Sequence, residues 1–496
     1  MPTNERRDLE LVLDSGTPIV VIQTTDEGRF LDLLTEITVA SPAKGYRPLF
    51  RWSVTDGLQR LDLDLEPQRH NAAPEEVLRH IRSVDKPGVY ALLDFHPFLD
   101  DAVNVRLLKD IAIAAAHSNI TVLLIGHRVE LPAELRRLSA QFSLRLPSKE
   151  ERLAIVQRCL DTYGEQHGGR VRIDPAALEM LVANLSGLTH ADTERLARNA
   201  VHDDGAITAE DVPAVMQAKY QLLNGGGVLS FEYETARLTE LAGFRAVKVW
   251  LKQRRSAFRG ECPRGLDPPR GLLLIGVQGC GKSVAAKAAA SVFGVPLLRL
   301  DFGALYNKYH GETERNLRES LATADVMGPC VLWLDEIEKG LAAGDDESGT
   351  SRRVLSGFLT WMAERKSSVF LVATANDVHQ LPPELVRKGR FDEIFFVDLP
   401  GPSTRAEILA IHLAKRGLSP DKFELPMLVD LTEGFSGAEL EQGIVAALYA
   451  AHAVGRDLCA AYVAAEYKKT RPLSVMMAEH VTALREWARS RTVAAE

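Results

Sequence analysis

The residues with the clearest capacity for chemistry lie in segment 271–283, which reads GLLLIGVQGCGKS. An apolar run precedes the pattern G-x-x-x-x-G-K-S, and an Ala-rich stretch that favours a helix follows it. In a strand–loop–helix of this kind, the loop N–H groups and the helix N-terminus bind phosphate. Lys282 is expected to contact the β- and γ-phosphates of a nucleotide, and the Ser283 hydroxyl to ligate Mg²⁺. The expected nucleotide-binding residues of the loop are Gly276, Val277, Gln278, Gly279, Cys280, Gly281, Lys282, Ser283 and Val284.

Two carboxylates follow a second apolar run, CVLWLDE, at residues 330–336. We expect Asp335 to hold Mg²⁺ through water and Glu336 to activate the attacking water. Solvated carboxylates at a strand end are the alternative. At about fifty residues beyond a phosphate loop, however, the pair favours phosphoryl transfer.

A third apolar run, VFLVATAN at residues 369–376, ends in the amide of Asn376. This amide could orient the attacking water or contact the γ-phosphate. The next segment, LPPELVRKGRFD at 381–392, carries Arg387 and Arg390, which a helix would place on one face. Their spacing alone favours an ordinary pair of solvated arginines.

These motifs, together with GFSGAEL at residues 434–440, resemble the AAA ATPases over roughly residues 240–448. The resemblance implies that Asn376 is the first sensor. It also implies that Arg387 and Arg390 are arginine fingers that act on the ATP of a neighbouring subunit. Catalysis would then require a homo-oligomeric ring, for which the family suggests a hexamer.

The same resemblance implies further contacts with the nucleotide. His412 matches the family histidine near the ribose and adenine, although its position is equally that of an ordinary helix residue. Gly437 and Ala438 match the second sensor region beside the base. Tyr309 and Gly311 resemble an aromatic–apolar–glycine pore loop that grips polypeptide, but the residue between them is a histidine. The alternative is that Tyr309 packs beside a helix start.

The elements around these residues alternate between strand-like and helix-like segments. Apolar, β-rich stretches at residues 17–23, 47–52, 89–95 and 120–126 predict a parallel sheet in the first part of the chain. We predict six parts. They are a degenerate AAA-like α/β domain (1–147), its helical lid (148–220), a linker with a leading helix (221–265), the ATPase α/β domain (266–400), a helical lid (401–458) and a helical tail (459–496).

The second half of the chain repeats the first. Residues 47–58, 131–137, 142–156 and 185–196 are echoed in the same order by 295–305, 381–387, 395–411 and 432–443. We therefore predict an α/β protein of two tandem AAA-type P-loop modules, each a parallel sheet flanked by helices with a small helical lid. The first module has QTTDEGRF in place of the phosphate loop, and Asp94–Phe95 in place of Asp335–Glu336. It is therefore expected to be degenerate; convergent α/β patterning is the alternative.

The composition is that of an ordinary globular protein: 496 residues, 46% hydrophobic and 25% charged. A net charge of −8 gives no reason to expect nucleic acid as a partner. The five cysteines lack metal-site spacing, which favours a reducing compartment. With no long apolar run, neither a signal peptide nor membrane insertion is expected.

The tail at residues 471–491, read as one helix, and the degenerate first module resemble the hypothetical chloroplast reading frame 46 family over the whole chain. This resemblance implies a soluble protein of a bacterial cytoplasm or plastid stroma. The expected function is that of an Mg²⁺-dependent ATP hydrolase whose ring remodels a protein partner. A slow nucleotide-gated switch or scaffold that does not thread a substrate is the alternative, and a nucleic-acid-dependent ATPase is less favoured.

Overall fold

The computed structural model divides into two compact units, Met1–Ile155 with Leu188–Arg195 and Val156–Gly187 with Leu196–Glu496. The expected pore-loop residues Tyr309 and Gly311 lie outside the described residues. Among the described helices, none is long and apolar enough to cross a bilayer. The structure describes residues 4–496 apart from 41–46, 62, 64–68, 128, 168–170, 203–204, 209–210, 224–227, 233–237, 261–264, 303–304, 306–312, 342–349, 366 and 388.

The first unit contains a six-stranded sheet in the order β3-β2-β4-β5-β1-β6. All neighbouring strands are parallel except β2 and β3, which pair antiparallel. The central strand β5 is buried along its whole length, as its mainly apolar sequence predicts. The strands are β1 (Ile19–Gln23), β2 (Leu49–Ser53), β3 (Gly57–Arg60), β4 (Gly88–Leu93), β5 (Ile120–Gly126) and β6 (Ser139–Phe142).

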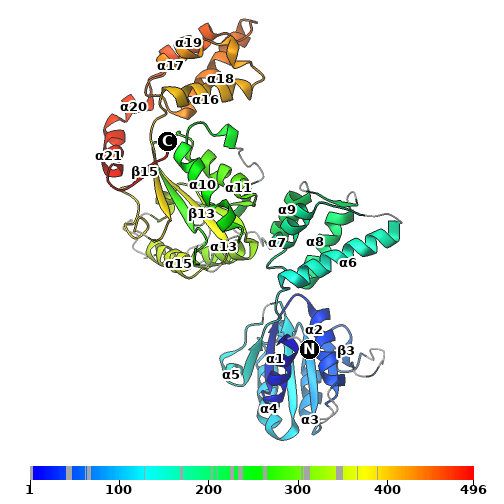
Figure 1. Ribbon diagram of the computed structural model, residues 1–496. Coiled ribbons are helices and arrows are strands. Elements are labelled where there is room, and N and C mark those ends of the chain that lie inside the picture. The colour runs from blue at the N-terminus through cyan, green and yellow to red at the C-terminus, as the bar shows by residue number, and fades with distance from the viewer. Residues whose placement is uncertain are drawn as a thin grey trace. The chain divides into compact units, whose positions relative to one another are not determined.

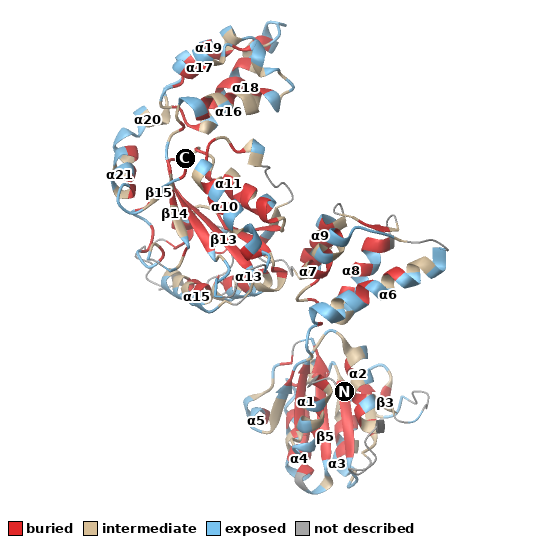
Figure 2. Ribbon diagram, in the orientation of Figure 1, coloured by how far each residue is buried: buried red, intermediate tan, exposed pale blue. Residues whose placement is uncertain are grey.

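Helices cover both faces of this sheet, whose strands β1, β4 and β5 are largely buried (Figure 2). Helices α1 (Asn4–Asp14) and α2 (Glu27–Ala40) bury apolar side chains on one face, and α3 (Pro74–Ser83) and α4 (Ala102–Ser118) do so on the other. Two short turns complete the unit's sheet domain, η2 (His96–Phe98) after β4 and α5 (Ala133–Arg136) after β5.

A helical segment follows the first sheet. In this segment the buried ammonium of Lys219 donates hydrogen bonds to the carbonyls of Asn184, Ser186 and Val326, at 3.0, 2.6 and 2.8 Å. Within the second unit, these bonds join α7 and α9 to the end of α13. The elements are α6 (Lys149–His167), β7 (Arg172–Ile173), α7 (Pro175–Asn184), α8 (His190–His202), β8 (Ala206–Ile207), α9 (Asp211–Leu223) and α13 (Thr313–Met327).

The second unit contains a seven-stranded sheet in the order β15-β14-β10-β13-β12-β11-β9. Figure 1 labels β13 and β15 of this sheet. Its order β14-β10-β13-β12-β11 reproduces β6-β1-β5-β4-β2 of the first sheet, so the predicted duplication of a parallel α/β module is confirmed. The strands are β9 (Leu229–Glu232), β10 (Gly271–Gly276), β11 (Leu297–Leu300), β12 (Cys330–Leu334), β13 (Val369–Ala375), β14 (Glu393–Val397) and β15 (Val493–Ala494).

Two helix layers and a separate helical lid surround this sheet. One layer contains α10 and α11, and the other contains α13, α14 and α15. The lid has its own apolar core. The elements are η3 (Leu238–Glu240), α10 (Arg245–Phe258), α11 (Lys282–Phe293), α14 (Ile337–Leu341) and α15 (Thr350–Glu364), then α16 (Pro402–Ala414), η4 (Pro420–Lys422), α17 (Leu425–Asp430), α18 (Gly437–Ala453) and α19 (Ala460–Lys469) of the lid.

The prediction that residues 471–491 form one helix is wrong. The chain forms α20 (Leu473–Met476) and α21 (Ala478–Ala488) and then returns to the sheet as β15 beside β14. The backbone N–H of Ala495 donates to the carbonyl of Phe396 at 2.9 Å. The helix breaks at Met477, whose φ of −120° and ψ of 36° lie outside the helical region, and β15 follows the predicted segment.

Strand register corrects the alignment of the two modules. Strands β4 and β12 pair with β5 and β13 in the same way, first residue against first residue. Counted from these starts, Asp94 occupies the position of Glu336, and His127 that of Asn376. Asp94 and Glu336 also share a left-handed backbone, with φ of 48° and 49°. The sequence-based match of Asp94 with Asp335 is therefore wrong by one residue, because β4 is one residue longer than β12.

Candidate nucleotide-binding and catalytic site

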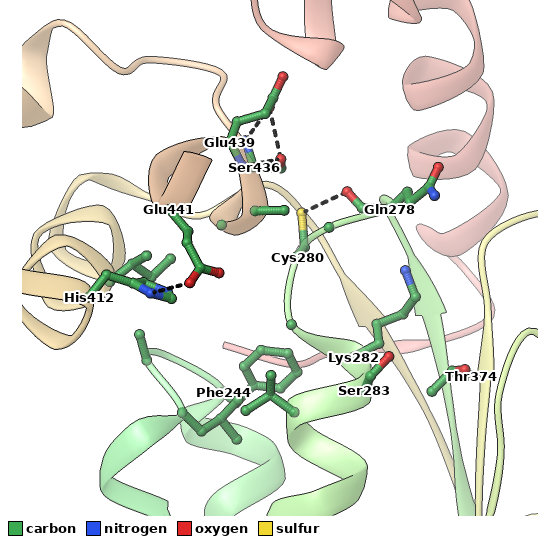
Figure 3. A pocket seen from close by; sticks show the side chains of 18 of the residues that line it. Phe244, Gln278, Cys280, Lys282, Ser283, Thr374, His412, Ser436, Glu439 and Glu441 are labelled. Atoms are coloured by element: carbon green, nitrogen blue, oxygen red, sulfur yellow. Dashed lines mark hydrogen bonds and ion pairs between the residues drawn. The ribbon is translucent and has the colours of Figure 1, made fainter. Parts of the chain in front are cut away.

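The motifs of the second module meet at the carboxyl end of its sheet, around a cavity of about 570 Å³ (Figure 3). The phosphate loop joins β10 to α11, and the ends of β12 and β13 and the lid complete the wall. The cavity therefore brings together residues from distant parts of the sequence. The predicted site residues that line it are Gln278, Gly279, Cys280, Gly281, Lys282, Ser283, Val284, Asp335, Glu336, Asn376, His412, Gly437 and Ala438.

At two glycines of the phosphate loop, the backbone lies close to other segments of the chain. A Cβ at Gly276 would lie 2.0 Å from the carbonyl oxygen of Val397, and one at Gly279 would lie 3.1 Å from the Cβ of Ala438. The N–H of Ala438 donates to the carbonyl of Gly279 at 2.9 Å. The start of lid helix α18 is thus hydrogen-bonded directly to the loop.

Lys282 begins helix α11 with its ammonium buried beneath the loop. Its Nζ donates to the carbonyls of Gly276 and Val277, both at 2.8 Å. Burial lowers the pKa of Lys282 to about 8, against the opposing effects of Cys280 and nearby carboxylates. An anionic phosphate beside this ammonium would favour the charged form again, so binding of phosphate and protonation of Lys282 reinforce each other.

Asp335 follows β12, and its carboxylate accepts hydrogen bonds from three side chains. The Ser283 hydroxyl lies 3.4 Å and the Thr374 hydroxyl 2.8 Å from its Oδ1, and the Arg299 guanidinium lies 3.3 Å from its Oδ2. Mg²⁺ prefers such oxygen ligands, and neighbouring ligands in its octahedral shell lie about 2.9 Å apart. The hydroxyl and carboxylate therefore fit an Mg²⁺ ion held directly or through one water.

Glu336 is held at the cavity in a left-handed backbone conformation. Its N–H donates to the Thr374 hydroxyl at 3.0 Å, and the Asn376 amide donates to its Oε1 at 2.8 Å. The ammonium of Lys339 pairs with its Oε2. The N–H of Asn376 donates to Glu338 at 2.9 Å, which fixes the first-sensor candidate beside the candidate base.

Sequence reasoning missed two of these residues, Thr374 and Arg299. Thr374 is a fully buried hydroxyl in a strand of otherwise apolar residues, and it bonds both Asp335 and the backbone of Glu336. A polar residue inside a buried run was the available signal. Arg299 comes from β11, and nothing in its local sequence points to Asp335.

The lid lines the far part of the cavity. His412 of α16 lies 3.3 Å from the carboxylate of Glu441, which also binds Arg416 at 2.9 Å. Burial lowers the pKa of His412, although Glu441 opposes this, so the imidazole is neutral at neutral pH. With Ile408 and Ile411, this neutral ring forms a mainly apolar surface suited to a nucleotide base.

Arg387 and Arg390 do not line the cavity, and the prediction that they lie on a helix is wrong. The segment forms turns, in which the N–H of Arg390 donates to the carbonyl of Arg387 at 3.3 Å. Gly389 lies between them with a φ of 96°, which interrupts any helical turn. Arg387 is exposed, and the Arg390 guanidinium donates to the carbonyl of Leu359 at 2.8 Å.

Comparisons with known proteins agree with this geometry. Residues 272–399 match the ATPase family associated with various cellular activities (AAA). Residues 5–144 match the N-terminal domain of SpoVK-like AAA ATPases, and residues 150–226 match the second domain.

Relatives match over different shares of the chain. The AAA domain-containing protein ycf46 of Trieres chinensis is 32% identical over 492 residues, which cover 97% of this chain and 96% of that protein. The protein of the same description from Pyropia yezoensis is 32% identical over 491 residues, or 98% of each chain. The proteasome-activating nucleotidase of Aeropyrum pernix is 39% identical over 192 residues, which cover 37% of this chain and 46% of that protein.

Proposed function

Because the chain belongs to the AAA ATPases, and over nearly its whole length to the ycf46 group, we propose that its second module hydrolyses ATP with Mg²⁺. One observation carries the proposal. Lys282, Ser283, Asp335, Glu336 and Asn376 converge on one cavity, although they come from three separate segments of the sequence. This set supplies a phosphate-binding ammonium, two oxygen ligands, a base and an orienting amide.

Nucleotide binding uses the two ends of the cavity. The loop N–H groups and Lys282 take the phosphates, while the apolar surface around His412 takes the base. Ser283 and Asp335 would hold Mg²⁺, which supplies charge neutralisation on the β- and γ-phosphates. The direct bond between Ala438 and Gly279 gives the lid a means to respond to the occupant of the loop.

Glu336 acts as the general base for the attacking water. Its Oε1 already accepts a hydrogen bond from the Asn376 amide. This bond fixes the orientation of the carboxylate toward the attacking water. As the water oxygen attacks the γ-phosphorus, its proton passes to the Glu336 carboxylate, and the bond to the β-phosphate oxygen breaks.

Arg387 and Arg390 would complete the site of a neighbouring copy. Both lie away from the cavity of their own chain, and Arg387 is exposed. We infer a homo-oligomeric ring, a hexamer by analogy with the family, in which these arginines reach the adjacent ATP. Turnover would move the lids and remodel a protein partner.

One contact favours a second candidate, a slow nucleotide-gated switch. The Lys339 ammonium pairs with the same carboxylate that must accept the proton, and this pairing raises the pKa of Lys339. A cation bound to the carboxylate competes with the attacking water for its oxygen atoms. If the contact persists with ATP bound, the enzyme hydrolyses slowly and ATP acts mainly as a conformational ligand.

The test measures steady-state ATP turnover and ATP-dependent sedimentation for wild type and Glu336→Gln. Glu319→Gln, which changes an exposed carboxylate on α13, is the matched control. We expect Glu336→Gln to lose turnover by at least about 10²-fold while still binding ATP and assembling. Equal turnover in wild type and Glu336→Gln would refute the assigned base. Faster turnover in Lys339→Met would support the switch.

A further inference from the structure

The first module gathers three metal-ligand side chains where the second module has its catalytic residues. Asp94 follows β4, His96 opens η2, and His127 follows β5, so all three lie at the carboxyl edge of the first sheet. Their candidate ligand atoms lie within 4.8 Å of one another, and the described part of the chain has no other such group.

The site has lost the features that bind phosphate. Helix α2 begins with Glu27 where α11 begins with Lys282. The connection before α2 comprises residues 24–26, compared with residues 277–281 before α11. An acidic residue at the start of α2 repels phosphate and attracts a cation.

The three side chains are placed as an open cluster. The His96 Nδ1 lies 3.8 Å from the Asp94 Oδ1, which is too long for a hydrogen bond. The rings of His96 and His127 have centroids 5.0 Å apart and are nearly perpendicular, at 81°. Asp94 and His127 are exposed, so an ion can enter from solvent.

The His96 nitrogen supplies a second observation. This atom, Nδ1, is buried and has no hydrogen-bond partner among the described residues. Buried polar atoms in folded proteins are nearly always paired with protein, water or an ion. A positive ion between His96 and Asp94 would satisfy this nitrogen and the carboxylate together.

Gly126, the last residue of β5, leaves room for the cluster. A Cβ there would lie 3.1 Å from the His96 Nδ1 and 3.3 Å from the Asp94 Oδ1. Any side chain at this position would therefore push against both candidate ligand atoms. The glycine lets the two groups approach over the strand end.

We propose that Asp94, His96 and His127 bind a divalent transition-metal ion of the Zn²⁺ class. Two imidazoles and one carboxylate suit this class, whereas Mg²⁺ and Ca²⁺ prefer oxygen ligands alone. In a tetrahedral zinc site, ligand atoms lie about 3.4 Å apart, so the side chains must close by roughly 1 Å. Three protein ligands leave the fourth position to water or to a group from a partner. The first module thus exchanges a nucleotide site for a metal site.

The test uses the full chain, stripped of metal by a chelator and free of nucleotide. Zn²⁺ is titrated calorimetrically, and Co²⁺ is followed by its visible absorption. We compare wild type with Asp94→Asn and His127→Gln, and use His117→Gln, an exposed histidine on α4, as the control. Each cluster variant should lower Zn²⁺ affinity at least about tenfold and remove the tetrahedral Co²⁺ absorption, while the control keeps both.

Thermal unfolding without metal separates lost ligation from lost folding. If a cluster variant unfolds early, Gly126→Ala serves in its place, because it crowds His96 and Asp94 and removes no ligand. Wild-type binding without tetrahedral Co²⁺ absorption overturns the proposal, as does a loss that His117→Gln shares. So does a Zn²⁺ affinity that the cluster variants leave unchanged, since it would place the ion elsewhere in the chain.

Discussion

Burial determines the chemistry of the cysteine in the phosphate loop. The Cys280 Sγ lies 3.8 Å from the carbonyl of Gln278, and burial raises the pKa of its thiol to about 12. Only the thiolate reacts readily, so this cysteine is inert near neutral pH. Cys459 precedes α19 and is exposed. The two residues differ in reactivity because of their surroundings.

We predict that iodoacetamide at about pH 8 modifies Cys459 in the native protein. The rate of modification of Cys280 should be lower by at least about a hundredfold. Peptide mass spectrometry of partly labelled protein gives both rates. Protein denatured before labelling is the control, in which both cysteines should react alike. Comparable native rates would mean that the phosphate loop opens to solvent far more than the structure indicates.

Two lid helices pack at one glycine. A Cβ at Gly443 of α18 would lie 2.0 Å from the ring of Tyr467 on α19. That ring is almost fully buried, and its hydroxyl donates to the carbonyl of Leu440 at 2.7 Å. The ring therefore has no free space into which it could move. This contact fixes the spacing of α18 and α19.

Gly443→Ala is expected to destabilise the lid by about 1–3 kcal/mol, because the added methyl overpacks the helix contact. Gly357→Ala is the matched control: Gly357 also lies in a helix, but its Cβ position has no neighbouring atom within 4 Å. There the alanine should stabilise the helix by up to about 1 kcal/mol. Thermal unfolding by circular dichroism should show opposite shifts, and equal shifts would contradict the packing argument.

At the scale of the whole molecule, the proposed ring gives a role to the two candidate arginine fingers. Arg387 is exposed, and neither arginine candidate lines the cavity. Membership of the AAA ATPase family supports nucleotide binding by this chain. The two exposed or off-cavity arginines are the reason to expect that several copies of the chain assemble. The expected bacterial cytoplasm or plastid stroma stays a prediction.

We predict that Arg387→Ala lowers ATP turnover by roughly 10³-fold and leaves nucleotide affinity unchanged. Arg489→Ala, at an exposed arginine beyond α21, should leave both unchanged. Mixing Arg387→Ala with Glu336→Gln subunits should restore part of the turnover, because some interfaces then combine an intact base with an intact arginine. If the mixture is no more active than its components, the arginine does not act across subunits.

Much of the fold and of the candidate site follows from the sequence. The apolar run at residues 120–126 is found as β5 with the same bounds, and the phosphate loop joins a strand to a helix as expected. Both features have local signals: burial on both faces requires a mainly apolar strand, and the G-x-x-x-x-G-K-S pattern marks a loop between a strand and a helix. The comparisons and the two matching sheets confirm the predicted pair of AAA-type modules.

Tertiary structure alone decided the contacts between distant segments. Thr374 and Arg299 reach Asp335 from two other strands, and Lys219 binds Val326 across 107 positions of sequence. The histidine and aspartate cluster of the first module likewise forms only when β4 and β5 lie side by side. Periodicity and motif spacing report which neighbours a residue has along the chain. Partners across a sheet depend on strand order and register, which the global packing of the core selects.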